Sequence, residues 1–233
     1  MSGKRILQIG GVLSGIVLIA FGIGAIVLSF NGRSTVNSSL EEEQITGSPD
    51  MTPAAIAGEV SAAKAAQSKL MSQLQAAGVN IKPSPIEAPS CSVAGKQVDT
   101  GREARCFAHY MRIHTFEATS GLTYSQMGRY TAKPGTPIKF TDGLGGTNDP
   151  AHALTDPKTQ QPTNNGRRDI WVTYTALTTA LNSSYMATQL ALFGVVVGVA
   201  LLLAGIGFIV LAFGALRDSP AGKAEPVAAT SSA

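Results

Sequence analysis

Charged residues are scarce in this sequence. Asp, Glu, Lys and Arg make up 14% of the 233 residues and leave a net charge of +3, whereas they make up about 25% of ordinary globular domains. No dense basic stripe with interleaved aromatic residues occurs, and that pattern is the usual sign of a nucleic-acid-binding surface. We therefore expect no nucleic-acid partner. The charges that are present avoid two long stretches, one near each end of the chain.

Short catalytic motifs are also absent. The sequence has no G-x-S-x-G, no Walker A motif and no Rossmann glycine fingerprint. Glycines cluster at residues 143–146, but no strand–helix pattern surrounds them, so we interpret this stretch as a loop. Two charge-free apolar stretches also lack the buried charges expected of a transporter or proton relay.

Histidine is rare. The sequence has three, His109, His114 and His152, and these are the histidines that could ligate a metal. His109 and His114 lie about 140° apart around a predicted helix and do not share a face. His114 and Glu117 do share one, and with His152 they could supply three ligands. The alternative is a structural hydrogen bond between His114 and Glu117. We favour the structural interpretation and predict neither a metal nor another cofactor.

Cysteine is equally rare, with only Cys91 and Cys106. The sequence has no C-x-x-C redox motif and no second cysteine pair for a zinc site. Two free thiols in a cytoplasmic domain are one interpretation, but a disulfide in an oxidising compartment fits better. The bond would close a loop of about 15 residues and stabilise the fold by about 3 kcal/mol in the chain-entropy model.

Two long apolar runs, residues 6–30 and 187–216, are present and carry no charge. A helix of about 25 residues is roughly 37 Å long, enough to cross a hydrocarbon core of about 30 Å. The first run could instead be a cleavable signal peptide, because Lys4 and Arg5 precede it. Its length and the lack of an A-x-A-like end favour an uncleaved anchor. We predict two transmembrane helices.

Small residues recur four apart in both runs, as Gly11 and Gly15 in the first and Gly194 and Gly198 in the second. Small residues let helices approach closely in lipid, where no hydrophobic force presses them together. We predict that these glycines pack the two helices as an antiparallel pair. The same faces could instead dock onto another subunit or form a homo-oligomer, and glycine is common in membrane helices in any case.

Positive residues flank the outer ends of the runs: Lys4 and Arg5 before the first, and Arg217 and Lys223 after the second. The positive-inside rule then places both termini in the cytoplasm. We predict that residues 1–5 form a short cytoplasmic N-terminus and that residues 217–233 form a disordered cytoplasmic tail. Residues 31–186 are predicted to form the main, extracytoplasmic domain of a multi-pass plasma-membrane protein.

The pattern of this domain predicts a mainly α fold. Residues 31–50 are polar and indicate a connector. Residues 53–77 and 101–120 have helical apolar periodicity, with Thr52 as an N-cap and Gly78 as a stop for the first helix. A short strand is predicted within residues 91–98.

The C-terminal half of the domain contains an irregular loop and then a long helix. Residues 130–168 hold so many Gly, Pro and Asn residues that a long helix is excluded, and so long a loop is usually functional or disordered. With Asp169 as N-cap, one continuous helix is predicted from residue 170 to 216, running from the domain into the membrane. Tyr110, His114, Glu117 and Trp171 are the residues predicted to form a polar or ligand-binding cluster.

Three stretches, residues 44–50, 113–124 and 175–216, resemble a family of small actinobacterial membrane proteins with two transmembrane helices. The middle stretch, Ile113 to Tyr124, is the most specific of the three. Members are often labelled aromatic ring-opening dioxygenases, a chemistry that needs two histidines and a carboxylate around iron on a soluble scaffold. The family has no established functional residue to carry over, so the resemblance implies the architecture and not an activity.

We therefore expect a membrane-anchored, non-enzymatic interaction protein, an accessory or assembly subunit of a cell-envelope or membrane complex. Its partners would be the lipid bilayer and other membrane or envelope proteins, with loop 130–168 as the contact surface. An extracytoplasmic ligand-sensing or small-molecule-binding protein is the alternative. A metalloenzyme is a third and weaker hypothesis, because the dioxygenase ligand set is missing.

Overall fold

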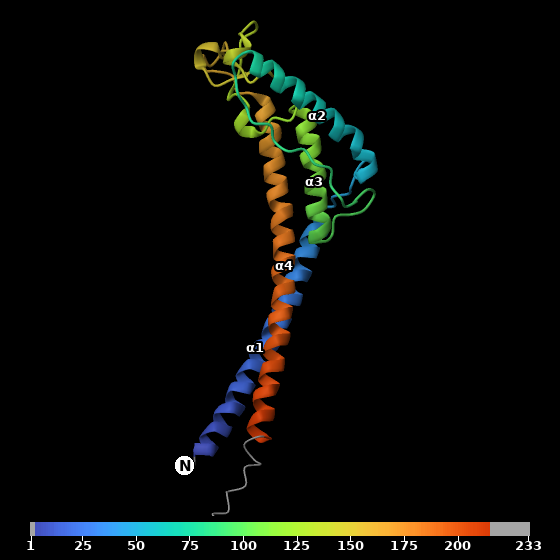
Figure 1. Ribbon diagram of the computed structural model, residues 1–233, viewed down its shortest axis with the longest axis vertical. Helices are drawn as coiled ribbons and strands as arrows, with labels where there is room; N and C mark the ends of the chain where they lie inside the picture. The colour runs from blue at the N-terminus through green and yellow to red at the C-terminus, as the bar shows by residue number, and fades with distance from the viewer. Residues whose placement is uncertain (1–2, 215–233) are drawn as a thin grey trace, which may run out of the picture. The chain divides into compact units, whose positions relative to one another are not determined.

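The computed structural model describes residues 3–214, and within them the fold is mainly helical, as predicted. The chain divides into two compact units, one formed by residues 1–32 with 190–233 and the other by residues 33–189. The four helices of the described chain are α1 (Gly3–Glu42), α2 (Pro53–Ala76), α3 (Gly101–Ala118) and α4 (Gly166–Phe213) (Figure 1).

The first unit consists of the apolar parts of α1 and α4, and both helices are long and apolar enough to cross a membrane. Only 11% of the most apolar window of α1 and 17% of that of α4 is buried. The large apolar side chains of both helices therefore face outward within this unit. The predicted end of the second helix at residue 216 and the predicted tail 217–233 lie outside the described residues.

Glycines bring α1 and α4 into close contact within this unit. A Cβ added at Gly15 would lie 2.7 Å from the carbonyl oxygen of Gly205, and one at Gly198 would lie 2.7 Å from that of Gly22. At Gly194 the added atom would meet the hydroxyl of Ser29. Gly11 is less tight, with Ala212 Cβ at 3.1 Å from the added atom. All four predicted packing glycines thus face the opposite helix.

The second unit has its core between α2 and α3, which pack side by side (Figure 1). Helix α2 begins as predicted: the Thr52 hydroxyl accepts a hydrogen bond from the N–H of Ala55 at 3.1 Å, and Pro53 follows at the first helical position. The helix ends before Gly78, which has a φ of +79°. Its buried side chains recur at three- and four-residue steps and comprise Ile56, Val60, Ala63, Gln67, Leu70 and Leu74.

Helix α1 is longer than the sequence predicts. Residues 31–42, interpreted as part of a connector, are helical up to Glu42. The polar composition of residues 31–42 gave no sign of a helix, but Val36 and Leu40 lie four residues apart and share a helix face. Leu40 is only 4% exposed and Val36 packs against the same core, so burial of this face stabilises the extra turns.

The strand predicted within residues 91–98 is not formed. This segment instead pairs with residues 46–47 through isolated bridges, Thr46 with Gln97 and Gly47 with Ala94. A Cβ at Gly47 would lie 2.0 Å from the carbonyl oxygen of Val93, so only glycine permits this close approach. Cys91 and Cys106 lie at disulfide distance, with an S–S separation of 2.04 Å, as predicted.

Residues 130–165 contain no long helix, as predicted, but they form a hydrogen-bonded lobe. Strands β1 (Tyr130–Thr131) and β2 (Gly146–Thr147) pair in an antiparallel sheet. The buried carboxylate of Asp142 accepts hydrogen bonds from the backbone N–H groups of Gly128, Leu144 and Gly146, each at 2.8 Å. One side chain therefore holds the two ends of the turn between the strands.

Helix α4 is continuous from the domain into the apolar segment, as predicted, but it begins earlier. Its first residue is Gly166, and the residue that caps it is Asn165 and not Asp169. The Asn165 side-chain oxygen accepts from the N–H of Arg167 at 3.1 Å, and its amide donates to the Gly128 carbonyl at 2.8 Å. Asp169 instead lies in the first turn, where a negative charge interacts favourably with the positive end of the helix dipole.

Candidate functional site

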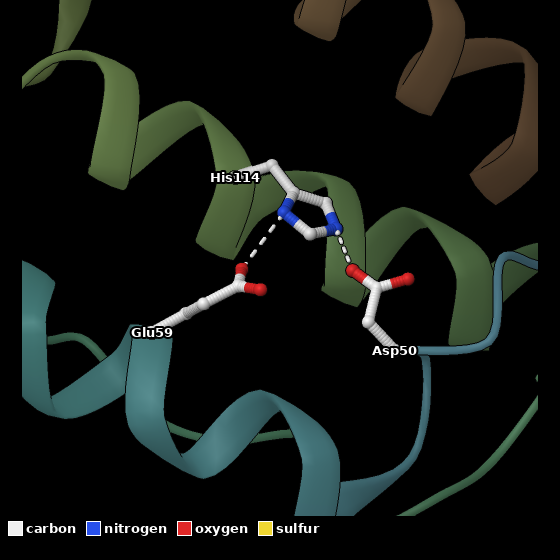
Figure 2. Close-up of side chains that lie close together, drawn as sticks. All are labelled: Asp50, Glu59 and His114. Carbon is white, nitrogen blue, oxygen red and sulfur yellow. Dashed lines mark ion pairs between the residues drawn. The ribbon is translucent and has the colours of Figure 1, made fainter.

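Asp50, Glu59 and His114 form a cluster of polar side chains in the second unit (Figure 2). The His114 Nε2 atom lies 3.3 Å from Asp50 Oδ2, and its Nδ1 atom lies 3.1 Å from Glu59 Oε2. The imidazole ring stands between the two carboxylates, each facing one ring nitrogen. We refer to these three residues as the Asp–Glu–His cluster.

Three separate segments position the cluster. Asp50 lies in the turn that precedes α2, where the Ser48 hydroxyl donates to the Asp50 carboxylate and the Thr52 N–H donates to the Asp50 carbonyl at 2.8 Å. Glu59 belongs to α2 and His114 to α3 (Figure 2). The packing of α2 on α3 therefore creates the cluster, and the Thr52 cap fixes where α2 begins relative to Asp50.

The cluster is half-buried and rich in negative charge. The side chains of His114, Asp50 and Glu59 are 28%, 35% and 32% exposed. No lysine or arginine within residues 3–214 forms an ion pair with either carboxylate. The Glu59 Oε2 atom is shielded from solvent and makes no aligned hydrogen bond, although it lies close to the ring. A shielded carboxylate oxygen without a hydrogen-bond donor is unfavourable, so a cation at this position would stabilise the cluster.

Two kinds of chemistry suit this arrangement. A protonated imidazole has an N–H group on each nitrogen and could face both carboxylates at once. Alternatively, one neutral nitrogen and a carboxylate oxygen from each acid could hold a metal ion. In either case the cluster joins the turn before α2, α2 itself and α3 through a single charged group.

Tyr110, predicted to belong to the ligand-binding cluster, is a core residue with no exposed surface. Its hydroxyl donates to the carbonyl of Cys91 at 2.5 Å. Burial raises the pKa of Tyr110, and the negative charge of Asp50 raises it further. Tyr110 therefore stays protonated as a donor that ties α3 to the disulfide-bonded segment.

Trp171 and Glu117, which were also predicted to belong to the ligand-binding cluster, lie outside the Asp–Glu–His cluster. The Trp171 indole N–H donates to the Leu122 carbonyl at 2.9 Å, and its ring packs edge-on against Phe116 at 5.5 Å between centroids. Glu117 is exposed and is not among the ion-pair partners of His114. Of the four predicted residues, His114 alone takes part in the Asp–Glu–His cluster.

His152, the third ligand of the sequence-based metal hypothesis, has partners of its own. Its Nδ1 atom lies 2.8 Å from Asp149 Oδ2, and its ring stacks on Phe140 with centroids 4.3 Å apart. The hydrogen bond with His152 lowers the pKa of the Asp149 carboxyl. The set of His114, Glu117 and His152 is thus replaced by Asp50, Glu59 and His114.

Sequence reasoning missed Asp50 and Glu59 because both lie far from His114 along the chain. No protein-family model, curated protein or solved structure matches the chain.

Proposed function

We propose that the chain is a membrane-anchored, non-enzymatic interaction protein, an accessory or assembly subunit of a membrane or cell-envelope complex. The observation that carries the proposal is the outward-facing apolar surface of α1 and α4, which 11% and 17% burial leaves exposed. Such a surface needs lipid or protein around it. The domain formed by residues 33–189 is then the part available to partners outside the bilayer.

The lobe at residues 130–165 supplies the proposed contact surface. Phe140 and Leu154 are each 40% exposed, although both are large apolar residues. They belong to a lobe whose turns are fixed by internal hydrogen bonds, so a partner would bind without ordering a long loop first. Exposed apolar side chains on a fixed scaffold are typical of a protein-binding surface.

The distribution of positive residues supports a plasma-membrane protein with both termini in the cytoplasm and residues 31–186 outside. The disulfide between Cys91 and Cys106 supports the same orientation, because such bonds persist in oxidising compartments. The second candidate function is an extracytoplasmic sensor of a small ligand, which the Asp–Glu–His cluster favours.

The decisive test is a mild-detergent purification of the tagged chain from its native membrane, with mass spectrometry of bound proteins. We expect a stoichiometric partner that is lost when Phe140 and Leu154 are both changed to Asp. Lys158→Asp is the matched control, since Lys158 is exposed in the same lobe. A chain that purifies alone would exclude the accessory-subunit proposal and leave the sensor as the working hypothesis.

A further inference from the structure

We propose that the Asp–Glu–His cluster binds one divalent first-row transition-metal ion. The ligands would be one imidazole nitrogen of His114 and one carboxylate oxygen each from Asp50 and Glu59. One ligand atom from each residue lies within 4.8 Å of the others. This inference is independent of the proposed interaction function.

The three side chains lie close enough together to converge on one ion. Zinc–ligand bonds of about 2.1 Å in a tetrahedral site place neighbouring ligand atoms about 3.4 Å apart. The observed nitrogen–oxygen separations are 3.3 Å to Asp50 and 3.1 Å to Glu59. A single ion uses only one of the two ring nitrogens, so the carboxylate facing the other nitrogen must rotate toward the ion. One ligand atom of each residue already lies within 4.8 Å of the others, so this rotation has a short distance to cover.

Charge and burial also favour a cation. The two carboxylates face one imidazole, and no lysine or arginine of the described chain neutralises them. The solvent-shielded Glu59 Oε2 atom lacks an aligned hydrogen-bond donor. A metal ion would satisfy this oxygen and balance the charge at once.

The donor types select the class of metal. Calcium and magnesium prefer sites made only of oxygen atoms, whereas imidazole nitrogen suits zinc, iron, cobalt and nickel. Three protein ligands leave at least one position for water. The half-exposed side chains give an ion a route from solvent.

The test uses the full-length chain in mild detergent after treatment with a chelator. Cobalt(II) is added, and binding is followed by its visible absorption, with zinc(II) as competitor and magnesium(II) as a non-competing control. We expect saturation at one cobalt ion per chain and displacement by zinc. Glu59→Gln and Asp50→Asn should each weaken binding by about tenfold or more, because each replaces a charged carboxylate ligand with a neutral amide.

His152→Gln is the matched control, because His152 pairs with an aspartate outside the cluster. Its cobalt affinity should equal that of the wild type. Circular dichroism and the mobility of the oxidised chain on a non-reducing gel verify that each variant is folded. The proposal is overturned if the wild type shows no saturable cobalt binding, if folded Glu59→Gln binds as tightly as wild type, or if His152→Gln loses as much affinity. The first result would leave the cluster as a structural contact between the histidine and its two carboxylates.

Discussion

Asp142 shows how one residue organises a segment that has almost no regular secondary structure. Its carboxylate is 5% exposed and accepts three backbone hydrogen bonds across a turn of glycines. Gly146 also permits this contact, because an added Cβ there would lie 2.2 Å from the Asp142 oxygen. The fixed lobe that presents Phe140 and Leu154 therefore depends on a single buried charge.

We expect Asp142→Asn to destabilise this lobe by about 1–3 kcal/mol, because an amide places N–H groups where one backbone N–H needs an acceptor. Hydrogen exchange measured by mass spectrometry should become faster in residues 128–147. Asp156→Asn is the control, since Asp156 also accepts two backbone N–H groups but in an exposed turn. Equal exchange in wild type and Asp142→Asn would contradict the role assigned to this carboxylate.

Single residues also mark the limit of what the sequence predicts. Cysteine pairing could be predicted, because two cysteines allow only one intramolecular bond. The Asp–Glu–His cluster could not, because helical spacing relates His114 only to neighbours such as Glu117. Contacts between α3 and the turn before α2 depend on tertiary packing, which no local period contains. For the same reason, the sequence predicted Tyr110 and Trp171 to line a binding site, whereas both are buried in the hydrophobic core.

At the scale of elements, the sequence predicted a helix end correctly where the end is set by residues next to it in the chain, such as an N-cap residue or a terminal glycine. Thr52 and Pro53 at the start of α2 and Gly78 after its end are such cases. The end of α1 and the start of α4 were predicted wrongly, because both depend on contacts with residues distant in the chain. Leu40 is buried in the domain core and so stabilises the last turns of α1. Asn165, which caps α4, also donates a hydrogen bond to the carbonyl of Gly128. Propensity alone cannot place an end that tertiary contacts determine.

The disulfide joins the irregular segment before α3 to the helix itself. Changing both Cys91 and Cys106 to Ser should lower the unfolding free energy by about 3 kcal/mol, since the closed loop has a sequence separation of 15 residues. Thermal unfolding followed by circular dichroism should show a midpoint lower by roughly 6–12 °C. Ser92→Ala, in the same exposed segment, should leave the midpoint unchanged. An unchanged midpoint in the double variant would mean that the Tyr110 hydrogen bond and local packing suffice.

The close contacts between α1 and α4 follow a seven-residue step on α1, whereas on α4 the steps are seven and then four residues. Gly15, Gly22 and Ser29 on α1 face the small residues Gly205, Gly198 and Gly194 on α4. A contact that recurs every seventh residue keeps one seam facing its partner when helices coil in a left-handed sense. The four-residue pairs found by sequence capture only part of this seam.

This seam gives a prediction with internal controls. Gly15→Leu and Gly205→Leu force bulk against backbone atoms at 2.7 Å, so each should lower the thermal midpoint in detergent by roughly 3–10 °C. Gly24→Leu and Gly207→Leu are the controls, because an added Cβ at either position meets nothing within 4 Å. Fluorescence-detected size-exclusion chromatography after heating measures the midpoint. Leucine is a better helix former than glycine, so helix propensity alone would not lower the midpoint of any of these variants. An equal loss in both pairs of variants would show that the close contact between α1 and α4 is not the cause.

At the scale of the whole molecule, orientation in the bilayer is the property on which the proposed function depends. The positive residues near the two ends predict cytoplasmic termini, and the disulfide fits an oxidising exterior. Both native cysteines are in the disulfide, so the wild-type chain should not react with maleimides. An introduced cysteine then reports the side on which its residue lies.

We expect Lys158→Cys to react with a membrane-impermeant maleimide in intact cells, because Lys158 is exposed in the proposed outer domain. Ser231→Cys should react only after the membrane is permeabilised. Reaction of the wild-type chain would show that the disulfide is open in the cell. If Ser231→Cys reacted in intact cells and Lys158→Cys did not, the domain would lie in the cytoplasm. The chain would then meet cytoplasmic partners, and the glutathione pool would determine whether its cysteines pair.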